Sequence, residues 1–247
     1  MLSKQVYLLE QAIAGWKNWN ISLSEKPKVE RELLGGSTNR SFLTISGFNK
    51  IVIRVNNQNN ENLGFDRQRE IKILALIESL NISPKIYFAD KNVLVSDFIE
   101  GYQWTNKDFA IPSNKEKVFS VINKIKNVKV PFFLERRKYS KYCQNYIKQL
   151  VATSNPRKNK FYDELMAVAV TLDSKVWSPV INHQDIVPGN LIEKDNQIFL
   201  IDWEYSAFGH PDIDLVRLYG LDYESESTKD LLFLQQGIDK LWSILRG

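Results

Sequence analysis

A short stretch near residue 190 constrains this chain more than any other, because polar residues there follow apolar runs at fixed intervals. Asp185 is followed five positions later by Asn190, with Pro188-Gly189 between them. A proline-glycine pair predicts a tight turn at this point. The apolar run Ile198–Ile201 then ends in Asp202, which is typical of a buried strand with a carboxylate at its end. The pattern predicts a site built from carboxylate and amide oxygens.

Composition limits the classes of protein to consider. With 247 residues, 43% of them hydrophobic, the chain can form one large domain or two packed lobes, so we expect a globular protein. A single cysteine, Cys143, and two histidines argue against a disulfide framework and a zinc site. The sequence has no run of eighteen apolar residues and no signal-peptide pattern at Met1. We therefore expect a cytoplasmic protein.

Charge is distributed unevenly along the chain. Lys115 to Lys160 contains 13 of the 33 basic residues, interleaved with apolar residues at helical spacing. This spacing favours a solvated helix face over a nucleic-acid or membrane surface, because no recognition motif accompanies it. Asp202 to Asp230 contains eight acids and two bases, which predicts an acidic surface suited to metal ions or a cationic substrate.

The pattern of secondary structure changes near Gly101. Before it, β-like segments flank Gly35-Gly36, the strand Ile51–Val55 carries Arg54, and the helix Asp66–Ser79 carries Glu70. Further segments are expected as a helix over 6–16 and as strands over 85–89 and 93–98, joined by a turn at 90–92. Helices are expected over 115–127, 139–153, 161–174 and 227–245. We therefore predict two lobes, over residues 1–100 and 101–247.

These features agree with phosphoryl transfer, which needs a proton acceptor for the nucleophile, oxygen ligands for magnesium and cations on the phosphates. Asp185 suits the role of proton acceptor, and Asn190 and Asp202 suit the role of magnesium ligands. The glycine pair and Arg54, which is held by Glu70, suit the role of binding and neutralising the phosphates. Taken singly, each has an ordinary explanation: a hairpin turn, a surface charge, a helix-dipole acid or a turn former.

Their joint occurrence in the order of a kinase favours the phosphoryl-transfer interpretation. Motifs for competing chemistries are missing from the sequence: Gly-x-Ser-x-Gly, HExxH, GxGxxG and Walker A.

The residues also resemble a known family. His183-Gln184-Asp185, with Asn190 and Asp202, resembles the catalytic and metal loops of the protein-kinase-like superfamily, in its choline kinase, thiamine kinase and aminoglycoside phosphotransferase branch. The sequence resembles the choline and thiamine kinases more closely than the aminoglycoside phosphotransferases. The segments that carry this closer resemblance are 34–40, 53–55, 66–70, 200–206 and 211–215. The resemblance covers roughly residues 30 to 220, although Gln184 stands where that family usually has asparagine.

The resemblance implies an α+β, bilobal protein-kinase-like fold with a β-rich N-lobe and a mainly helical C-lobe, and ATP and Mg²⁺ as cofactors. It implies Asp185 as the catalytic base and Asn190 and Asp202 as magnesium ligands. The residues it places at the nucleotide are Gly35, Gly36, Ser37, Asn39, Arg54, Glu70, Asp97, Phe98 and Ile99. It places Glu204 and Tyr205 at the acceptor, where a carboxylate beside an aromatic ring suits a cation, and Trp104 is a further candidate wall.

The predicted function is therefore that of an ATP-dependent kinase acting on the hydroxyl of a small cationic alcohol, with thiamine and choline as leading acceptors. An aminoglycoside or sugar acceptor is the alternative within the same class. An inactive nucleotide-binding regulator on the same fold is the alternative of another class, and the complete set of Asp185, Asn190 and Asp202 argues against it. Nucleic acid and membranes are not expected as partners.

Overall fold

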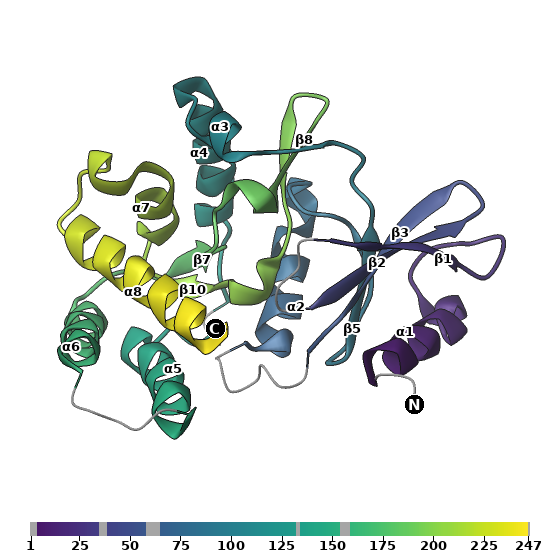
Figure 1. The fold of residues 1–247 in the computed structure, drawn as a ribbon. Coiled ribbons are helices and arrows are strands. Elements are labelled where there is room, and N and C mark those ends of the chain that lie inside the picture. Colours follow the sequence, from purple (N-terminus) through teal and green to yellow (C-terminus); the bar gives the residue numbers. More distant parts are fainter. Residues whose placement is uncertain (1–3, 35–38, 58–64, 132–133, 154–158, 247) are drawn as a thin grey trace. The chain divides into compact units, whose positions relative to one another are not determined.

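The protein was analysed as a computed structural model that describes residues 4–34, 39–57, 65–131, 134–153 and 159–246 (Figure 1). Contacts divide the chain into two compact units. Unit 1 comprises Met1–Asn60, Asp66–Trp104 and Gly189–Asp202, and unit 2 comprises Glu61–Phe65, Thr105–Pro188 and Trp203–Gly247. The predicted lobes, residues 1–100 and 101–247, stay a prediction.

Unit 1 is rich in β-structure. An antiparallel sheet with the order β1-β2-β3-β5-β4 contains β1 (Lys28–Leu33), β2 (Arg40–Ser46), β3 (Asn49–Val55), β4 (Ile86–Ala89) and β5 (Val93–Asp97). A second sheet, with the order β6-β8-β9, contains β6 (Tyr102–Gln103), β8 (Leu191–Lys194) and β9 (Gln197–Leu200). The helical elements are α1 (Lys4–Ala14), α2 (Arg67–Ile77) and the 3-10 turns η1 (Trp16–Asn18) and η3 (Glu78–Leu80). The 3-10 turn η4 (Pro188–Asn190) has its first residue in unit 2 and its other two residues in unit 1.

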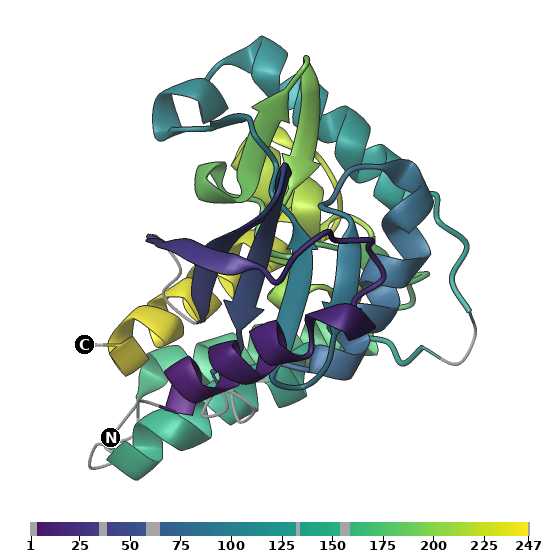
Figure 2. The same cartoon turned by 90° about the vertical axis from the view of Figure 1, so that its right-hand side faces the viewer.

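The side chains of β3 alternate between the apolar core of unit 1 on one face and a polar cluster on the other. Ile51, Ile53 and Val55 are buried in a cluster with Leu9 of α1, which lies along this sheet (Figures 1 and 2). Because successive side chains of a strand point to opposite faces, Arg54 points away from this cluster. One strand thus serves packing and chemistry at once.

Local hydrogen bonds fix the ends of the elements beside the site. The Asp66 carboxylate accepts the Arg69 N–H at 3.0 Å, so it caps α2 and confirms the predicted start of that helix. Asp90 accepts the N–H groups of Asn92 and Val93 at 2.7 and 2.8 Å, which confirms the predicted turn between β4 and β5.

Unit 2 is mainly helical. Its helices are α3 (Asn106–Phe109), α4 (Pro112–Lys126), α5 (Tyr139–Thr153), α6 (Lys160–Ser174), α7 (Ile213–Tyr219) and α8 (Thr228–Arg246), with the 3-10 turns η5 (Trp203–Tyr205) and η6 (Gly220–Asp222). The strands β7 (Val180–Asn182) and β10 (Ala207–Gly209) pair with each other. The predicted helices are confirmed as α4, α5, α6 and α8, and α5, α6 and α8 share one apolar core (Figure 1). Helix α7 was not expected from the sequence.

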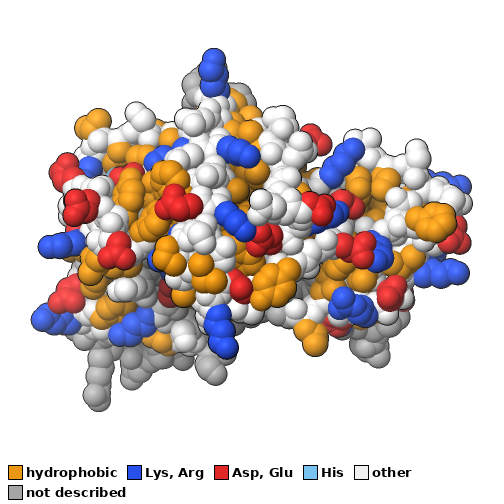
Figure 3. Space-filling model, turned by 90° about the horizontal axis from the view of Figure 1, so that it is seen from above, with side chains coloured by type: hydrophobic (Ala, Val, Ile, Leu, Met, Phe, Trp, Pro, Cys, Tyr) orange, Lys and Arg blue, Asp and Glu red, His pale blue; other side chains and the backbone are white. Residues whose placement is uncertain are grey.

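The surface has mixed charge. Helix α4 buries Val118, Val121, Ile122 and Ile125 and exposes Lys124, which is the pattern of a solvated amphipathic helix. On the face seen from above, the described Lys and Arg side chains alternate with Asp and Glu (Figure 3). Among the described residues, no helix is long and apolar enough to cross a membrane.

Candidate active site

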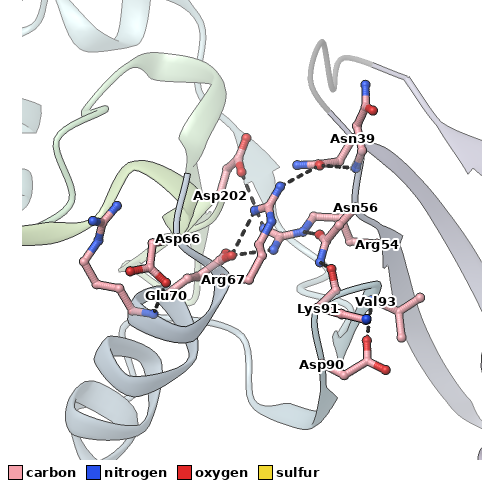
Figure 4. Close-up of polar contacts among 12 residues, drawn as sticks. Asn39, Arg54, Asn56, Asp66, Arg67, Glu70, Asp90, Lys91, Val93 and Asp202 are labelled. Atoms are coloured by element: carbon pink, nitrogen blue, oxygen red, sulfur yellow. Dashed lines mark hydrogen bonds and ion pairs between the residues drawn. The ribbon is translucent and has the colours of Figure 1, made fainter. Parts of the chain in front are cut away.

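A buried ion pair between β3 and α2 lies at the centre of a polar cluster in unit 1 (Figure 4). Arg54 donates from Nη2 to Glu70 Oε2 at 2.7 Å, so the predicted pairing is confirmed. Arg54 also donates from Nε to Asn56 Oδ1 at 3.1 Å. Burial alone would raise the pKa of Glu70, but the charges and hydrogen bonds of Arg54 and Arg67 outweigh it and the pKa is lowered. Glu70 is therefore a carboxylate at neutral pH.

A second arginine, which the sequence analysis did not identify, shares this carboxylate. Arg67 donates to Glu70 Oε2 at 3.0 Å and to Asn39 Oδ1 at 2.9 Å (Figure 4). The same Asn39 oxygen accepts the Asn57 N–H at 3.1 Å. Arg67 thus links α2 to Asn39, the residue before β2, and the role of Asn39 at the nucleotide stays a prediction. The glycine pair, predicted to bind phosphate, and Ser37, which the resemblance places at the nucleotide, lie outside the described residues.

Asn190 and Asp202 are held at neighbouring points of the β8–β9 sheet. The Ile201 N–H donates to the Asn190 carbonyl at 3.0 Å, which ties the residue before Asp202 to Asn190. Asp202 has a φ of 63°, a left-handed conformation that is uncommon for a residue other than glycine. Its Oδ1 lies 3.7 Å from Arg54 Nη1 (Figure 4). Asp202 therefore belongs to the same polar group as Arg54 and Glu70.

This donor set fits a magnesium ion in chemical type. A carboxylate and an amide supply hard oxygen ligands, and the Asp202 side chain is 35% exposed, so an ion can reach it. Within the described part of the chain, no three His, Cys, Asp or Glu side chains gather to form a metal site of their own. Two protein ligands suit magnesium only where phosphate oxygens and water complete its coordination.

Unit 2 contains the loop of Asp185, which follows β7. The buried Asp214 carboxylate accepts the N–H groups of His183 and Gln184, both at 2.8 Å. Gln184 has a φ of 65°, so these bonds stabilise a left-handed turn immediately before Asp185. Burial raises the pKa of Asp214 and outweighs the opposing effect of His183 and of the backbone hydrogen bonds.

The ring of His183 is buried and supports the same loop. It makes an edge contact with Trp203 at 4.7 Å between ring centroids, and its Nδ1 accepts the Asp185 N–H at 3.3 Å. The Asp185 side chain is 25% exposed, with Oδ1 lying 3.5 Å from Arg217 Nη2. The structure thus presents a partly exposed carboxylate on a fixed backbone, as a general base requires.

The candidate acceptor residues have different surroundings. Glu204 is only 1% exposed, whereas Tyr205 is half-buried with its ring 4.9 Å from that of Phe65. Trp104 is buried in unit 1 and donates from its indole to Glu193 at 3.0 Å. The expectation that Asp202 to Asp230 forms an acidic surface is wrong for two of its acids, Glu204 and Asp214. These carboxylates lie in the interior, where Asp214 accepts backbone hydrogen bonds.

Three residues that the resemblance places at the nucleotide lie at the end of β5: Asp97 is its last residue, and Phe98 and Ile99 follow it. Asp97 donates its N–H to the Lys85 carbonyl at 2.9 Å, and Phe98 donates to the Lys50 carbonyl at 3.2 Å. Ile99 is buried. This segment is thus held by the sheet of unit 1, and its role at the nucleotide stays a prediction.

Among the solved structures that are similar to this chain are two of LicA. A crystal structure of LicA in complex with AMP matches with a TM-score of 0.73 and 23% identity, over 97% of this chain and 89% of that chain. A choline kinase LicA from Streptococcus pneumoniae matches with a TM-score of 0.72 and 22% identity, over 97% and 90%. The chain therefore has the protein-kinase-like fold of the choline kinases, which confirms the predicted α+β fold class.

The sequence then defines the family. A family model described as choline/ethanolamine kinase matches residues 30–228, and the chain belongs to that family. The protein LicA from Haemophilus influenzae is 27% identical over 213 residues, which are 81% of this chain. The matched region is 60% of the length of that relative.

Proposed function

We propose that this protein is an ATP-dependent kinase that phosphorylates the hydroxyl group of a small cationic amino alcohol, with choline as the first candidate. The observation that carries the proposal is the family match over residues 30–228, which includes every predicted site residue from Gly35 to Tyr205. Choline takes precedence over thiamine because the family is that of choline and ethanolamine kinases. The structure of LicA with AMP supports a nucleotide as the second substrate.

The described side chains have tasks that suit this reaction. Asp185 accepts the proton of the acceptor hydroxyl as the hydroxyl oxygen forms a bond to the terminal phosphorus of ATP, while the bond from that phosphorus to the bridging oxygen breaks and ADP leaves. Arg54, ordered by Glu70, neutralises phosphate oxygens. Asn190 and Asp202 would hold Mg²⁺, which neutralises phosphate charge when bound.

For the remaining predicted residues we propose binding roles. Gly35, Gly36, Ser37 and Asn39 cover the phosphates, and the segment from Asp97 to Ile99 contacts adenine. At the acceptor, the Glu204 carboxylate contributes negative potential and the Tyr205 ring offers a cation–π face. Trp104, engaged with Glu193, is the least supported of the acceptor residues.

An ADP-release assay with ATP and Mg²⁺ tests the proposal. Choline, ethanolamine, thiamine, an aminoglycoside and a hexose would be compared at equal concentration, with product identity checked by phosphorus NMR. We expect turnover with choline or ethanolamine, and a loss of about 10²–10⁴-fold in kcat for Asp185→Asn, because general-base catalysis contributes on that order. Asp195→Asn, at an exposed position between β8 and β9, is the matched control and should keep wild-type turnover.

Other outcomes would redirect the assignment. Turnover of the aminoglycoside or the hexose alone would replace the cationic alcohol by a sugar acceptor. ATP binding without phosphorylation of any acceptor would favour a nucleotide-binding regulator. Equal activity of Asp185→Asn and wild type would contradict the role of Asp185 as the base.

A further inference from the structure

Helix α7 presents two charged residues to the loop of Asp185. Asp214 and Arg217 are three positions apart, so they lie on the same helix face. Asp214 accepts the backbone N–H groups of His183 and Gln184, whereas Arg217 Nη2 lies 3.5 Å from the Asp185 carboxylate. The helix therefore contacts both the backbone of the loop and the side chain of its last residue.

Arg217 is itself held by the C-terminal helix. Its Nη1 and Nη2 donate to the two carboxylate oxygens of Asp239 on α8, at 2.5 and 3.1 Å. This is the bidentate geometry in which a planar guanidinium is best fixed. The Arg217 side chain is 19% exposed and that of Asp239 is 53% exposed. Arg217 is thus more tightly bound to Asp239 than to Asp185.

A second contact strengthens the same connection. Gln235 is four positions before Asp239 and so lies on the same face of α8. The buried Gln235 side chain donates to the Ile213 carbonyl, at the first turn of α7, at 2.9 Å. Helix α8 therefore holds α7 at its start through Gln235 and at Arg217 through Asp239.

We propose that Arg217 is a positioning residue that sets the orientation of the Asp185 carboxylate, and that Asp239 aims Arg217 for this task. The inference rests on the proposed role of Asp185 as the base. A carboxylate that is one-quarter exposed can rotate about its Cα–Cβ bond, and a fixed cation on one side favours one rotamer. The fork to Asp239 also keeps Arg217 from closing fully onto Asp185.

Steady-state kinetics of purified variants test the inference. We expect Arg217→Gln to lower kcat by about 10–100-fold while the KM for ATP changes less than about twofold, because misplacement of a reacting group costs rate on this order. Arg217→Lys keeps the positive charge but cannot form the bidentate hydrogen bonds to Asp239, so its kcat should lie between those of wild type and Arg217→Gln. Asp239→Asn should lower kcat less than Arg217→Gln, because it loosens Arg217 without removing it.

Two further variants separate positioning from general weakening of α8. Asp230→Asn removes another ion pair of the same helix, with Lys175 at 3.2 Å, and should leave kcat within about twofold of wild type. In the double variant Arg217→Gln/Asp239→Asn, kcat should equal that of Arg217→Gln alone, because Asp239 acts through Arg217. Thermal unfolding of each variant establishes the folded fraction. If Arg217→Gln does not fold, Arg217→Lys and Asp239→Asn provide the test.

The inference is overturned if Asp230→Asn lowers kcat as much as Arg217→Gln does, if the losses in the double variant multiply, or if only KM changes. Slow hydrolysis of ATP in the absence of an alcohol is measured in parallel. If the wild type hydrolyses ATP but phosphorylates no alcohol, the proposed acceptor is wrong, while the order of the variants in hydrolysis still decides the role of Arg217. A wild type without either activity would overturn both.

Discussion

Each unit contains a carboxylate that is almost fully buried, and the two are stabilised in opposite ways. Glu70 in unit 1 is 2% exposed and binds two arginine side chains, Arg54 and Arg67. Asp214 in unit 2 is 1% exposed and accepts the backbone N–H groups of His183 and Gln184. Burial raises the pKa of both acids, but only at Glu70 do nearby cations outweigh it, so the pKa of Glu70 is lowered and that of Asp214 is raised.

The difference shows what each carboxylate does for its site. Glu70 balances charge and fixes the side chains of Arg54 on β3 and Arg67 on α2. Asp214 shapes a backbone turn, including the left-handed Gln184, and so determines where Asp185 stands. Removing Glu70 would leave the buried Arg54 and the half-buried Arg67 without their shared partner, whereas removing Asp214 would take the acceptor from two N–H groups. We expect the first change to be more costly.

Glu70→Ala should therefore have the largest effect. We expect the free energy of unfolding to fall by about 3–5 kcal/mol, because one partner of a buried ion pair is removed. Urea denaturation followed by tryptophan fluorescence gives the change. Glu32→Ala is the matched control, since Glu32 also accepts two hydrogen bonds from one arginine, Arg40, but at the surface of the same sheet. The control should cost much less than Glu70→Ala, because an ion pair at the solvent-exposed surface contributes little to stability, and equal costs would contradict the assigned importance of burial.

Asp214→Asn should have an intermediate effect. The amide keeps one acceptor oxygen and places an NH₂ group against the other N–H, so we expect a cost of about 1–3 kcal/mol. The turn at Gln184 should also loosen, and kcat should fall by more than the folded fraction explains. Unfolding in urea and ADP release measure the two effects. Asp222→Asn, at an exposed position of η6, should change stability by less than about 0.5 kcal/mol. A kcat that stays at the wild-type value would show that Asp214 does not shape the loop.

The sequence allowed the prediction of the pair in unit 1 because both of its residues stand in regular elements. Arg54 interrupts an apolar strand, and Glu70 lies in the first turn of a capped helix. The sequence around each residue therefore predicts the element that contains it. Arg67 was missed, although it stands three positions before Glu70, because Arg69 is an equally good candidate in the sequence. Only packing decides which of the two arginines points inward.

Helix α7 illustrates the opposite case. At seven residues it makes only about two turns, too few for apolar periodicity to identify it. Asp212 and Asp214 are two positions apart and have the same chemistry, yet Asp214 is buried and Asp212 is partly exposed. The sequence favoured a solvated acidic segment, because a buried acid is expected only where specific donors meet it. Those donors are backbone groups of His183 and Gln184, about thirty residues earlier, and no side-chain pattern reveals them.

The smallest of the expected effects is on the pH dependence of stability, in which the contributions of Glu70 and Asp214 should have opposite signs. Glu70 has a lowered pKa, so its contribution is present above its unfolded pKa of about 4.3 and is lost as the pH falls through the folded value. Asp214 has a raised pKa, so its contribution is present below an unfolded pKa of about 3.9 and is lost as the pH rises through the folded value. Acidification therefore changes the two contributions in opposite directions.

Glu70→Gln should flatten the loss of stability on acidification, because it removes the group whose proton uptake opposes folding. Asp214→Asn should steepen that loss, because it removes the group whose proton uptake favours folding. Each change is at most about 1.4 kcal/mol per pH unit, the limit for one titrating group. Urea denaturation at steps between about pH 3 and pH 7 measures the slopes relative to wild type. If both variants changed the slope in the same direction, the two buried carboxylates would not be stabilised in opposite ways, since only opposite pKa shifts produce slopes of opposite sign.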